Sequence, residues 1–192
     1  MKPYTIRPSP ESRLELRVAK TGFLSGKQHL FVFESYRGML HYTPENPEGS
    51  RVSLTIDAGS AVCKDTWVSA KDLQKIQNFA RDEMLNVREH PAITFTSESV
   101  RPTSPGRFEA KGTLTIRGVG RAAVVLVSFV SSAEGPLRFE GSAQIRLTDY
   151  GLKPPSAALG TIGTTNEMSF LFALTGHPEG SSGVTETASF PE

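Results

Sequence analysis

Residues 137–147, with the sequence LRFEGSAQIRL, alternate without interruption between apolar or small side chains and polar ones. Successive side chains of a β-strand point to opposite faces of a sheet, so this period of two predicts one long strand with a dry face and a wet face. A strand of this length needs a strongly twisted sheet, which favours closure into a barrel.

Seven further segments have the alternation or the composition of β-strands, with turns between them. They are residues 14–19, 28–42, 52–57, 92–100, 107–116, 122–130 and 167–176. Within the second segment, Gly38 suggests a bulge or a sharp bend, because glycine weakens the interior of a strand. About eight strands with short turns predict a mainly β chain folded as a single antiparallel eight-stranded barrel, with a β-sandwich as the alternative.

One segment has a different period. In residues 67–85, Leu73, Ile76, Ala80 and Met84 recur at spacings of three and four, which predicts a helix with one packed face. Ser69 precedes it as a capping residue, and Pro91 closes the segment. The sequence therefore predicts one helix between two strands of the barrel.

The segment Gly118-Val119-Gly120-Arg121-Ala122-Ala123 fits the glycine pattern of a dinucleotide-binding turn. That motif needs a following helix, whose N-terminus binds the pyrophosphate. The residues that follow here are AAVVLVSFV, which are rich in β-branched side chains and favour a strand. The pattern is therefore interpreted as a turn between two strands, and no nucleotide cofactor is expected.

Composition limits the classes of partner and of chemistry. The 192 residues carry 21 basic and 20 acidic side chains spread along the chain, so nucleic acid is not an expected partner. Cys63 is the single cysteine, which excludes an internal disulfide. His29, His41, His90 and His177 lie at no metal-binding spacing, and no catalytic motif is present, so neither a metal, a cofactor nor catalytic residues are expected.

The ends of the chain predict its organisation. The first ten residues contain prolines and no apolar run, so neither a signal peptide nor a membrane span is expected. The chain as written is therefore predicted to be cytoplasmic, or periplasmic if a precursor carries a signal peptide. Residues 177–192 are polar and rich in Gly, Ser, Thr and Pro, as in a tail. We expect one domain at 1–176 and a polar tail at 177–192.

The inward faces of the strands carry the candidate ligand-binding residues. Gly141 and Ala143 are small in the middle of a strand where a filled core would place Leu or Ile, which indicates a void. The phenylalanines of these faces are equally compatible with plain core packing and with the lining of a tunnel. The candidate set is Leu16, Phe31, Phe33, Leu54, Ile56, Ile93, Phe95, Leu114, Ile116, Val125, Val127, Phe129, Phe139, Gly141, Ala143, Ile145, Phe170 and Phe172.

Several segments in this order resemble the YceI-like polyisoprenoid-binding family. They are EMLNVREHPAITFTSESV, GRFEAKGTLTIRGVGRAAVVLVSFV, DYGL and GTIGTTNEMSFLFAL, with YTIRP and RVSLTIDAGSAV in front, and the resemblance covers residues 4–175. It implies a lipocalin-like barrel of eight antiparallel strands with a helix between two of them and an elongated apolar cavity for an isoprenoid or other lipid chain. The family's usual His-Ser near the first strand is Glu11-Ser12 here, so a role for that histidine does not carry over.

Together these features predict a protein that binds, transports or stores a long-chain apolar lipid without chemistry. The alternatives are a hydrolase or isomerase acting in the same cavity and a stress-related interaction module with a filled core. Loops at residues 149–166, with Trp67 and Tyr150, are candidates for the cavity mouth. Val124, Leu126 and Val130 form an outward apolar row, expected to pack on the helix or on a second subunit in a homodimer.

Overall fold

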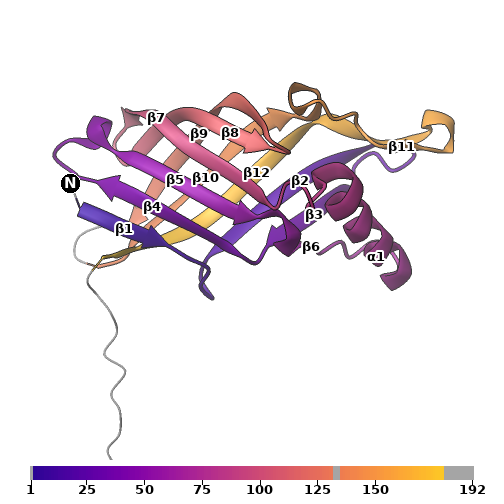
Figure 1. Cartoon of the computed structure of the whole chain (residues 1–192), viewed down its shortest axis with the longest axis horizontal. Coiled ribbons are helices and arrows are strands. Elements are labelled where there is room, and N and C mark those ends of the chain that lie inside the picture. The colour runs from indigo at the N-terminus through magenta and orange to yellow at the C-terminus, as the bar shows by residue number, and fades with distance from the viewer. Residues whose placement is uncertain (1, 132–134, 180–192) are drawn as a thin grey trace, which may run out of the picture.

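The computed structural model describes residues 2–131 and 135–179, which form twelve strand segments and one principal helical segment (Figure 1). The strands are β1 (Lys2–Ile6), β2 (Arg13–Gly22), β3 (Gln28–Phe33), β4 (Tyr36–Tyr42), β5 (Arg51–Asp57), β6 (Ala61–Cys63), β7 (Ala92–Ser104), β8 (Arg107–Ile116), β9 (Val119–Ser131), β10 (Leu137–Arg146), β11 (Ser156–Ala157) and β12 (Ile162–Pro178). The helix α1 (Ala70–Phe79) continues into a π-helical turn, η3 (Ala80–Leu85). Short 3₁₀ turns lie at Pro47–Gly49, Ala58–Ser60, Leu147–Tyr150 and Ala158–Gly160.

Eight strands close into an antiparallel barrel. Their order is β1, β4, β5, β7, β8, β9, β10 and β12, and β12 pairs back with β1 through Tyr4↔Pro178 and Ile6↔Gly176. This arrangement confirms the predicted mainly β barrel with one helix, and the sandwich alternative is wrong. A closed barrel removes the exposed strand edges that an open sheet leaves for aggregation.

The barrel is extended at one end by β2, β3 and β6. The first two thirds of β12 pair with β2, from Ile162↔Gly22 to Ala173↔Arg13, and β3 and β6 follow outward from β2. β6 pairs with β3 alone within residues 2–131 and 135–179, and α1 packs against it (Figure 1). We call this end, opposite the N-terminus, the helical end.

The helix has the face that its sequence predicts. Leu73, Ile76, Ala80 and Met84 pack against the core, and the Ser69 hydroxyl oxygen accepts a hydrogen bond from the backbone N–H of Asp72 at 3.1 Å. The helical segment ends in left-handed Asn86 (φ 47°), five residues before Pro91. In the described part of the chain, no helix is both long enough and apolar enough to cross a membrane.

The glycine pattern at residues 118–123 is a hairpin, as predicted. Arg117 and Gly118 both have positive φ (51° and 72°) and connect β8 to β9, with Ile116 opposite Val119. Two central residues with positive φ form the turn whose twist matches that of a β-hairpin. Gly120 is already part of β9 and makes no phosphate-binding loop.

Two glycines have roles that the sequence did not predict. In β10 the alternation holds, with Ala143 buried and Gln144 exposed, but Gly141 marks no void. A Cβ at Gly141 would overlap the carbonyl oxygen of Leu126 and lie 2.6 Å from Cζ of Phe172. The interruption expected at Gly38 lies instead between β3 and β4, at residues 34–35. A Cβ at Gly38 would nevertheless lie 2.7 Å from the carbonyl oxygen of Ser53.

The outward apolar row of β9 stays exposed. The exposed fractions of Val124, Leu126 and Val130 are 42%, 54% and 61%. The expectation that this row packs on the helix is wrong, because α1 packs on β6. Self-association through the row stays a prediction.

The C-terminal boundary differs slightly from the expected one. β12 continues through Pro178, and His177 pairs with Thr5, so the first two residues of the expected tail belong to the barrel. Residues 180–192 lie outside the described residues.

Replacing Gly141 with alanine should destabilise the protein strongly, because the new methyl group has no space between β9 and the Phe172 ring. We expect the free energy of unfolding to fall by about 3 kcal/mol, as for overpacking of a dense core. Urea denaturation measures the change. Ser142→Ala, the neighbouring residue on the same strand, is the control and should stay within about 0.5 kcal/mol of the parent. Equal stability of the two variants would contradict the close approach of the strands.

Candidate functional site

Inside the barrel lies an apolar cavity of about 120 Å³, which we call the barrel cavity. Its wall comes from all eight strands of the closed ring, and eleven of the eighteen candidate ligand-binding residues contribute to it. They are Leu54, Ile56, Phe95, Leu114, Val125, Val127, Phe129, Phe139, Ala143, Phe170 and Phe172. Leu14, Leu40, Phe108 and Leu174 also line it, although they were not among the candidate ligand-binding residues.

Aromatic rings occupy much of the barrel around this cavity. The Tyr42 and Phe129 ring centroids lie 4.8 Å apart, Phe108 and Phe129 5.2 Å, and Phe129 and Phe139 6.1 Å, with Phe139 to Phe172 at 6.4 Å. Tilted and edge-to-face contacts of this kind stabilise a core beyond simple burial. The barrel is therefore partly filled, and the space left is close to that of an engineered cavity of about 150 Å³ that binds benzene.

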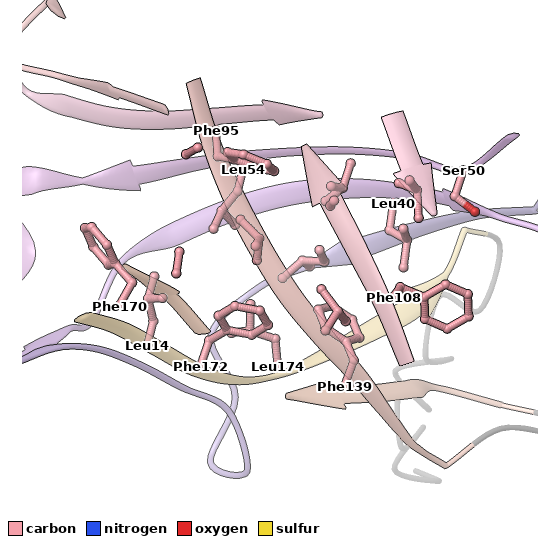
Figure 2. A pocket seen from close by; sticks show the side chains of 18 of the residues that line it. Leu14, Leu40, Ser50, Leu54, Phe95, Phe108, Phe139, Phe170, Phe172 and Leu174 are labelled. Carbon is pink, nitrogen blue, oxygen red and sulfur yellow. The ribbon is translucent and has the colours of Figure 1, made fainter. Parts of the chain in front are cut away.

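One polar atom interrupts the apolar lining. Ser50 is 3% exposed, and its hydroxyl oxygen has no hydrogen-bond partner among the described residues. Figure 2 shows Ser50 at one end of the barrel cavity and Phe170 at the other. An unpaired buried hydroxyl lowers the stability of the empty protein, because it has lost its contacts with water and gained none in exchange.

Replacing Ser50 with alanine should therefore stabilise the empty protein by about 1 kcal/mol, because the unpaired hydroxyl is removed without a change in the backbone. Thermal or urea denaturation of the purified protein measures this. Ser69→Ala is the matched control, since that hydroxyl caps α1 and its loss should destabilise by about 1 kcal/mol. A loss of stability in Ser50→Ala would show that the Ser50 hydroxyl has a partner.

A second apolar cavity of about 330 Å³ lies at the helical end, and we call it the helix-end cavity. Six candidate residues line it, namely Leu16, Phe31, Phe33, Ile93, Ile116 and Phe170. Its other wall is the helical segment, through Ile76, Phe79, Ala80, Met84 and Leu85. The periodicity predicts three of these for the packed face of the helix, whereas all the candidate ligand-binding residues lie on strands.

Phe170 contributes to the walls of both cavities. It lines both, and its ring stacks on that of Phe33 with centroids 6.2 Å apart and an angle of 24° between the planes. The barrel cavity and the helix-end cavity are therefore adjacent, and Phe170 is the residue that lines both.

Two candidate residues line neither cavity. Ile145 is buried at 6% exposed in the core, and Gly141 borders a groove on the outer face of the sheet. Tyr150, expected near the mouth, is 4% exposed and packs in the core, where burial raises the pKa of its hydroxyl. Trp67 is half-buried beside the helix-end cavity.

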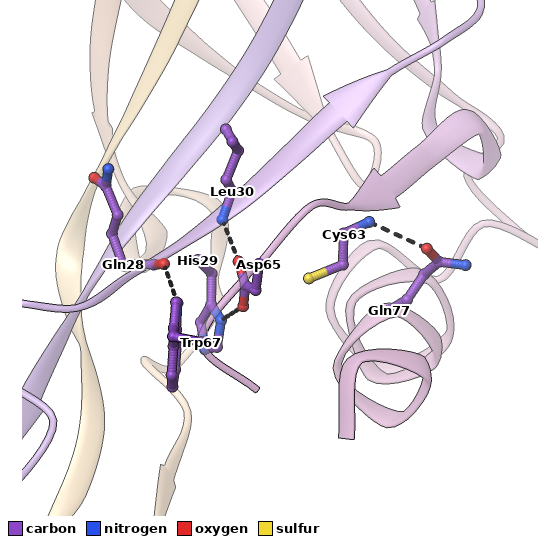
Figure 3. A network of polar contacts seen from close by, with 7 residues as sticks. All are labelled: Gln28, His29, Leu30, Cys63, Asp65, Trp67 and Gln77. Carbon is purple, nitrogen blue, oxygen red and sulfur yellow. Dashed lines mark hydrogen bonds and ion pairs between the residues drawn. The ribbon is translucent and has the colours of Figure 1, made fainter. Parts of the chain in front are cut away.

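A polar cluster beside the helix-end cavity was not predicted from the sequence. Nδ1 of His29 lies 2.6 Å from Oδ2 of Asp65, and the other carboxylate oxygen accepts the backbone N–H of Leu30 at 2.8 Å (Figure 3). Trp67 stacks on the His29 ring at 5.4 Å and donates its indole N–H to the carbonyl of Gln28 at 3.0 Å. This cluster joins β3 to the segment after β6. His29 and Asp65 are 36 positions apart, so no local sequence pattern predicted their contact.

Cys63 lies next to this cluster without the properties of a nucleophile. It is 2% exposed, and its backbone N–H donates to Oε1 of Gln77 at 3.1 Å, which ties β6 to α1 (Figure 3). Burial raises the pKa of its thiol to about 11, and the nearby Asp65 carboxylate acts in the same direction. The thiol is therefore neutral at physiological pH. Within residues 2–131 and 135–179, no three His, Cys, Asp or Glu side chains are grouped to bind a metal ion.

The folded protein should react slowly with a thiol reagent at pH 8. The rise of the Cys63 pKa from 9.0 to about 11 lowers the thiolate fraction about a hundredfold, and burial slows access further. Absorbance after addition of a disulfide reagent measures the rate, and the same protein unfolded in guanidinium is the control. Equal rates in both states would contradict the buried, neutral thiol.

A protein-family model described as a YceI-like domain matches residues 4–174. The chain belongs to the YceI-like family. Among curated relatives of this YceI-like chain, a UPF0312 protein of Ectopseudomonas mendocina is 28% identical over 125 residues, which are 62% of this chain and 62% of that protein. A UPF0312 protein of Pseudomonas aeruginosa is 25% identical over 73% of this chain and 70% of its own length. The aligned part thus covers less than two thirds of the first of these relatives.

Solved structures show the same fold for this YceI-like chain. BcnA of Burkholderia cenocepacia matches with a TM-score of 0.66 and 17% identity, over 85% of this chain and 95% of that one. A polyisoprenoid-binding domain from Saccharophagus degradans matches with a TM-score of 0.63 and 14% identity, over 91% and 98%. The family resemblance in the sequence is confirmed.

The departure at Glu11-Ser12 has a visible structural use in this YceI-like chain. Glu11 is exposed and forms an ion pair with Arg138 of β10, and the Ser12 hydroxyl receives a hydrogen bond from Ser9 at 2.8 Å. The ion pair attaches the loop between β1 and β2 to β10, and the Ser9–Ser12 hydrogen bond lies within that loop. Neither residue lines a cavity.

Proposed function

We propose that this YceI-like protein binds one long-chain apolar ligand without covalent chemistry, with the chain running from the helix-end cavity past Phe170 into the barrel cavity. The observation that carries the proposal is the pair of adjacent apolar cavities, which share the Phe170 side chain in their walls. A linear isoprenoid or fatty chain is narrow and flexible, and fits a space of this shape. One solved neighbour is named as a polyisoprenoid-binding domain, which supports the same class of ligand here.

The volumes decide how such a ligand is held. The helix-end cavity of about 330 Å³ falls within the usual range for small-molecule pockets, about 300 to 1,000 Å³, whereas the barrel cavity of about 120 Å³ does not. A long chain therefore needs both cavities and some rotation of the rings that fill the barrel. Phe170 must turn away from Phe33 for the chain to pass.

Burial supplies the driving force. Each methylene removed from water contributes about 0.8 kcal/mol, so ten methylenes contribute about 8 kcal/mol before costs. Ordering of the chain and loss of its free translation oppose this. Displaced aromatic rings add a further cost, so affinity should depend on how many carbon atoms pass Phe170.

The alternative of a hydrolase or isomerase has less support. His29 and Asp65 are the titratable pair nearest the cavities, but both oxygens of Asp65 are engaged and Trp67 stacks on the imidazole. The nearby Cys63 thiol is neutral at physiological pH. These groups stabilise the junction of β3 and β6 and offer no activated nucleophile.

A bulky residue in the barrel cavity should block the ligand. Ala143 lines that cavity and Gln144 points outward, so Ala143→Phe should lower the affinity for a C16 or longer chain at least tenfold, while Gln144→Phe should bind like the parent. Native mass spectrometry after solvent extraction and reloading measures bound chain per protein. Circular dichroism and urea denaturation verify that both variants are folded.

Two results would oppose the proposal. If the parent neither carries nor takes up any chain, the barrel is a filled core and the interaction-module alternative is favoured. If Ala143→Phe and Gln144→Phe load equally well, the ligand lies outside the barrel cavity.

A further inference from the structure

Polar side chains gather on one wall of the helix-end cavity. Lys20 of β2 and Thr164 of β12 are direct partners across the two strands, and both line the cavity. His29 of β3 lines it as well, opposite Val18, two residues before Lys20. In contrast, the lining of the barrel cavity includes no charged side chain, and its single unpaired hydroxyl is that of Ser50.

Both Lys20 and Thr164 have unused bonding capacity. Lys20 is half-buried and forms no ion pair or side-chain hydrogen bond with the described residues. Burial lowers the pKa of its ammonium group, an effect that the Asp65 carboxylate partly opposes. The Thr164 hydroxyl is buried and has no partner within the same residues. A half-buried cation beside an unpaired donor is costly in the empty protein and favours an incoming anion.

The charges around this wall favour an anion rather than a cation. No aspartate or glutamate lines the helix-end cavity, while Lys75 of α1 lines it in addition to Lys20. The nearest acid, Asp65, has a fully buried side chain and is already bound to His29 and to the Leu30 backbone. Lys75 lies 3.4 Å from Asp72 on the exposed side of the helix, so Lys20 is the cation left free to bind a ligand.

We propose that Lys20 and the Thr164 hydroxyl bind the acidic head group of the ligand, a carboxylate or a phosphate, so that the chain enters the barrel cavity tail first. This inference rests on the proposed function and adds to it the charge class and the orientation of the ligand. A carboxylate or phosphate oxygen accepts hydrogen bonds from both an ammonium and a hydroxyl group, and charge-assisted bonds of this kind are about twice as strong as neutral ones. The tail then occupies the barrel cavity beyond Phe170, where the lining is apolar.

Three probes of equal chain length distinguish binding of the head group from binding of the chain. They are hexadecanoic acid, hexadecyl phosphate and hexadecanol. Trp67 is the single tryptophan of the sequence and stacks on His29 at the cavity wall, so its fluorescence reports binding there. Native mass spectrometry gives the stoichiometry. Lys20→Met keeps the apolar stem and removes the charge, and Thr164→Val keeps the shape and removes the hydroxyl.

The parent should bind both acids at least about tenfold more tightly than the alcohol, because one charge-assisted contact is worth about a factor of ten or more. Lys20→Met should lose that preference and leave hexadecanol binding unchanged within about twofold. Thr164→Val should weaken both acids about threefold. Lys27→Met, on the exposed turn of the same hairpin, is the matched control and should behave like the parent.

The outcomes separate this inference from the function on which it rests. If the parent binds acids and alcohol equally, or if Lys20→Met and Lys27→Met weaken the acids alike, the head-group site is overturned while chain binding stands. A preference for only one of the two acids, lost in Lys20→Met, supports the site and identifies which head group it takes. If none of the three probes binds, the proposed function itself fails.

Discussion

The pairing of β12 with two separate strands is the constraint on which the rest of the structure depends. Seventeen residues long, β12 pairs with β10 on one side, and on the other side first with β2 and then with β1. The last contact closes the ring, while the first extends the sheet into the helical end. One continuous strand therefore carries residues of both cavities, and Phe170, near its middle, lines both.

The division of the interior into two compartments follows from this geometry. In the closed ring every strand has a neighbour on both sides, so the inner faces approach closely and aromatic rings fill most of the space. At the helical end the sheet opens and a helix covers it, and because the helical residues contact β6 at its edge, a larger space remains. The polar side chains of Lys20, His29 and Thr164 line this second compartment.

The sequence predicted those features that depend on neighbours along the chain. The alternation in β10, the face of α1 and the hairpin at Arg117-Gly118 are local patterns, and each is confirmed. Gly141 was misinterpreted because its reason for being small lies on β9 and β12, on either side of it. Lys20 and Thr164 are 144 positions apart, and their adjacency depends on a register that no local pattern sets. The inward faces were thus predictable, but the partition of those faces between two cavities was not.

The free edge of β6 has a consequence for how the interior exchanges with its surroundings. The backbone of β6 pairs with β3 on one side, and on its other side it is bonded to the helical segment. The Gln77 side chain accepts the backbone N–H of Cys63, and the Arg81 guanidinium donates to the carbonyl of Ala61 at 2.9 Å. Tilting the helical segment outward would break these side-chain bonds and some apolar contacts but no strand ladder. We therefore expect local opening between the helical segment and β6 to cost less free energy than global unfolding.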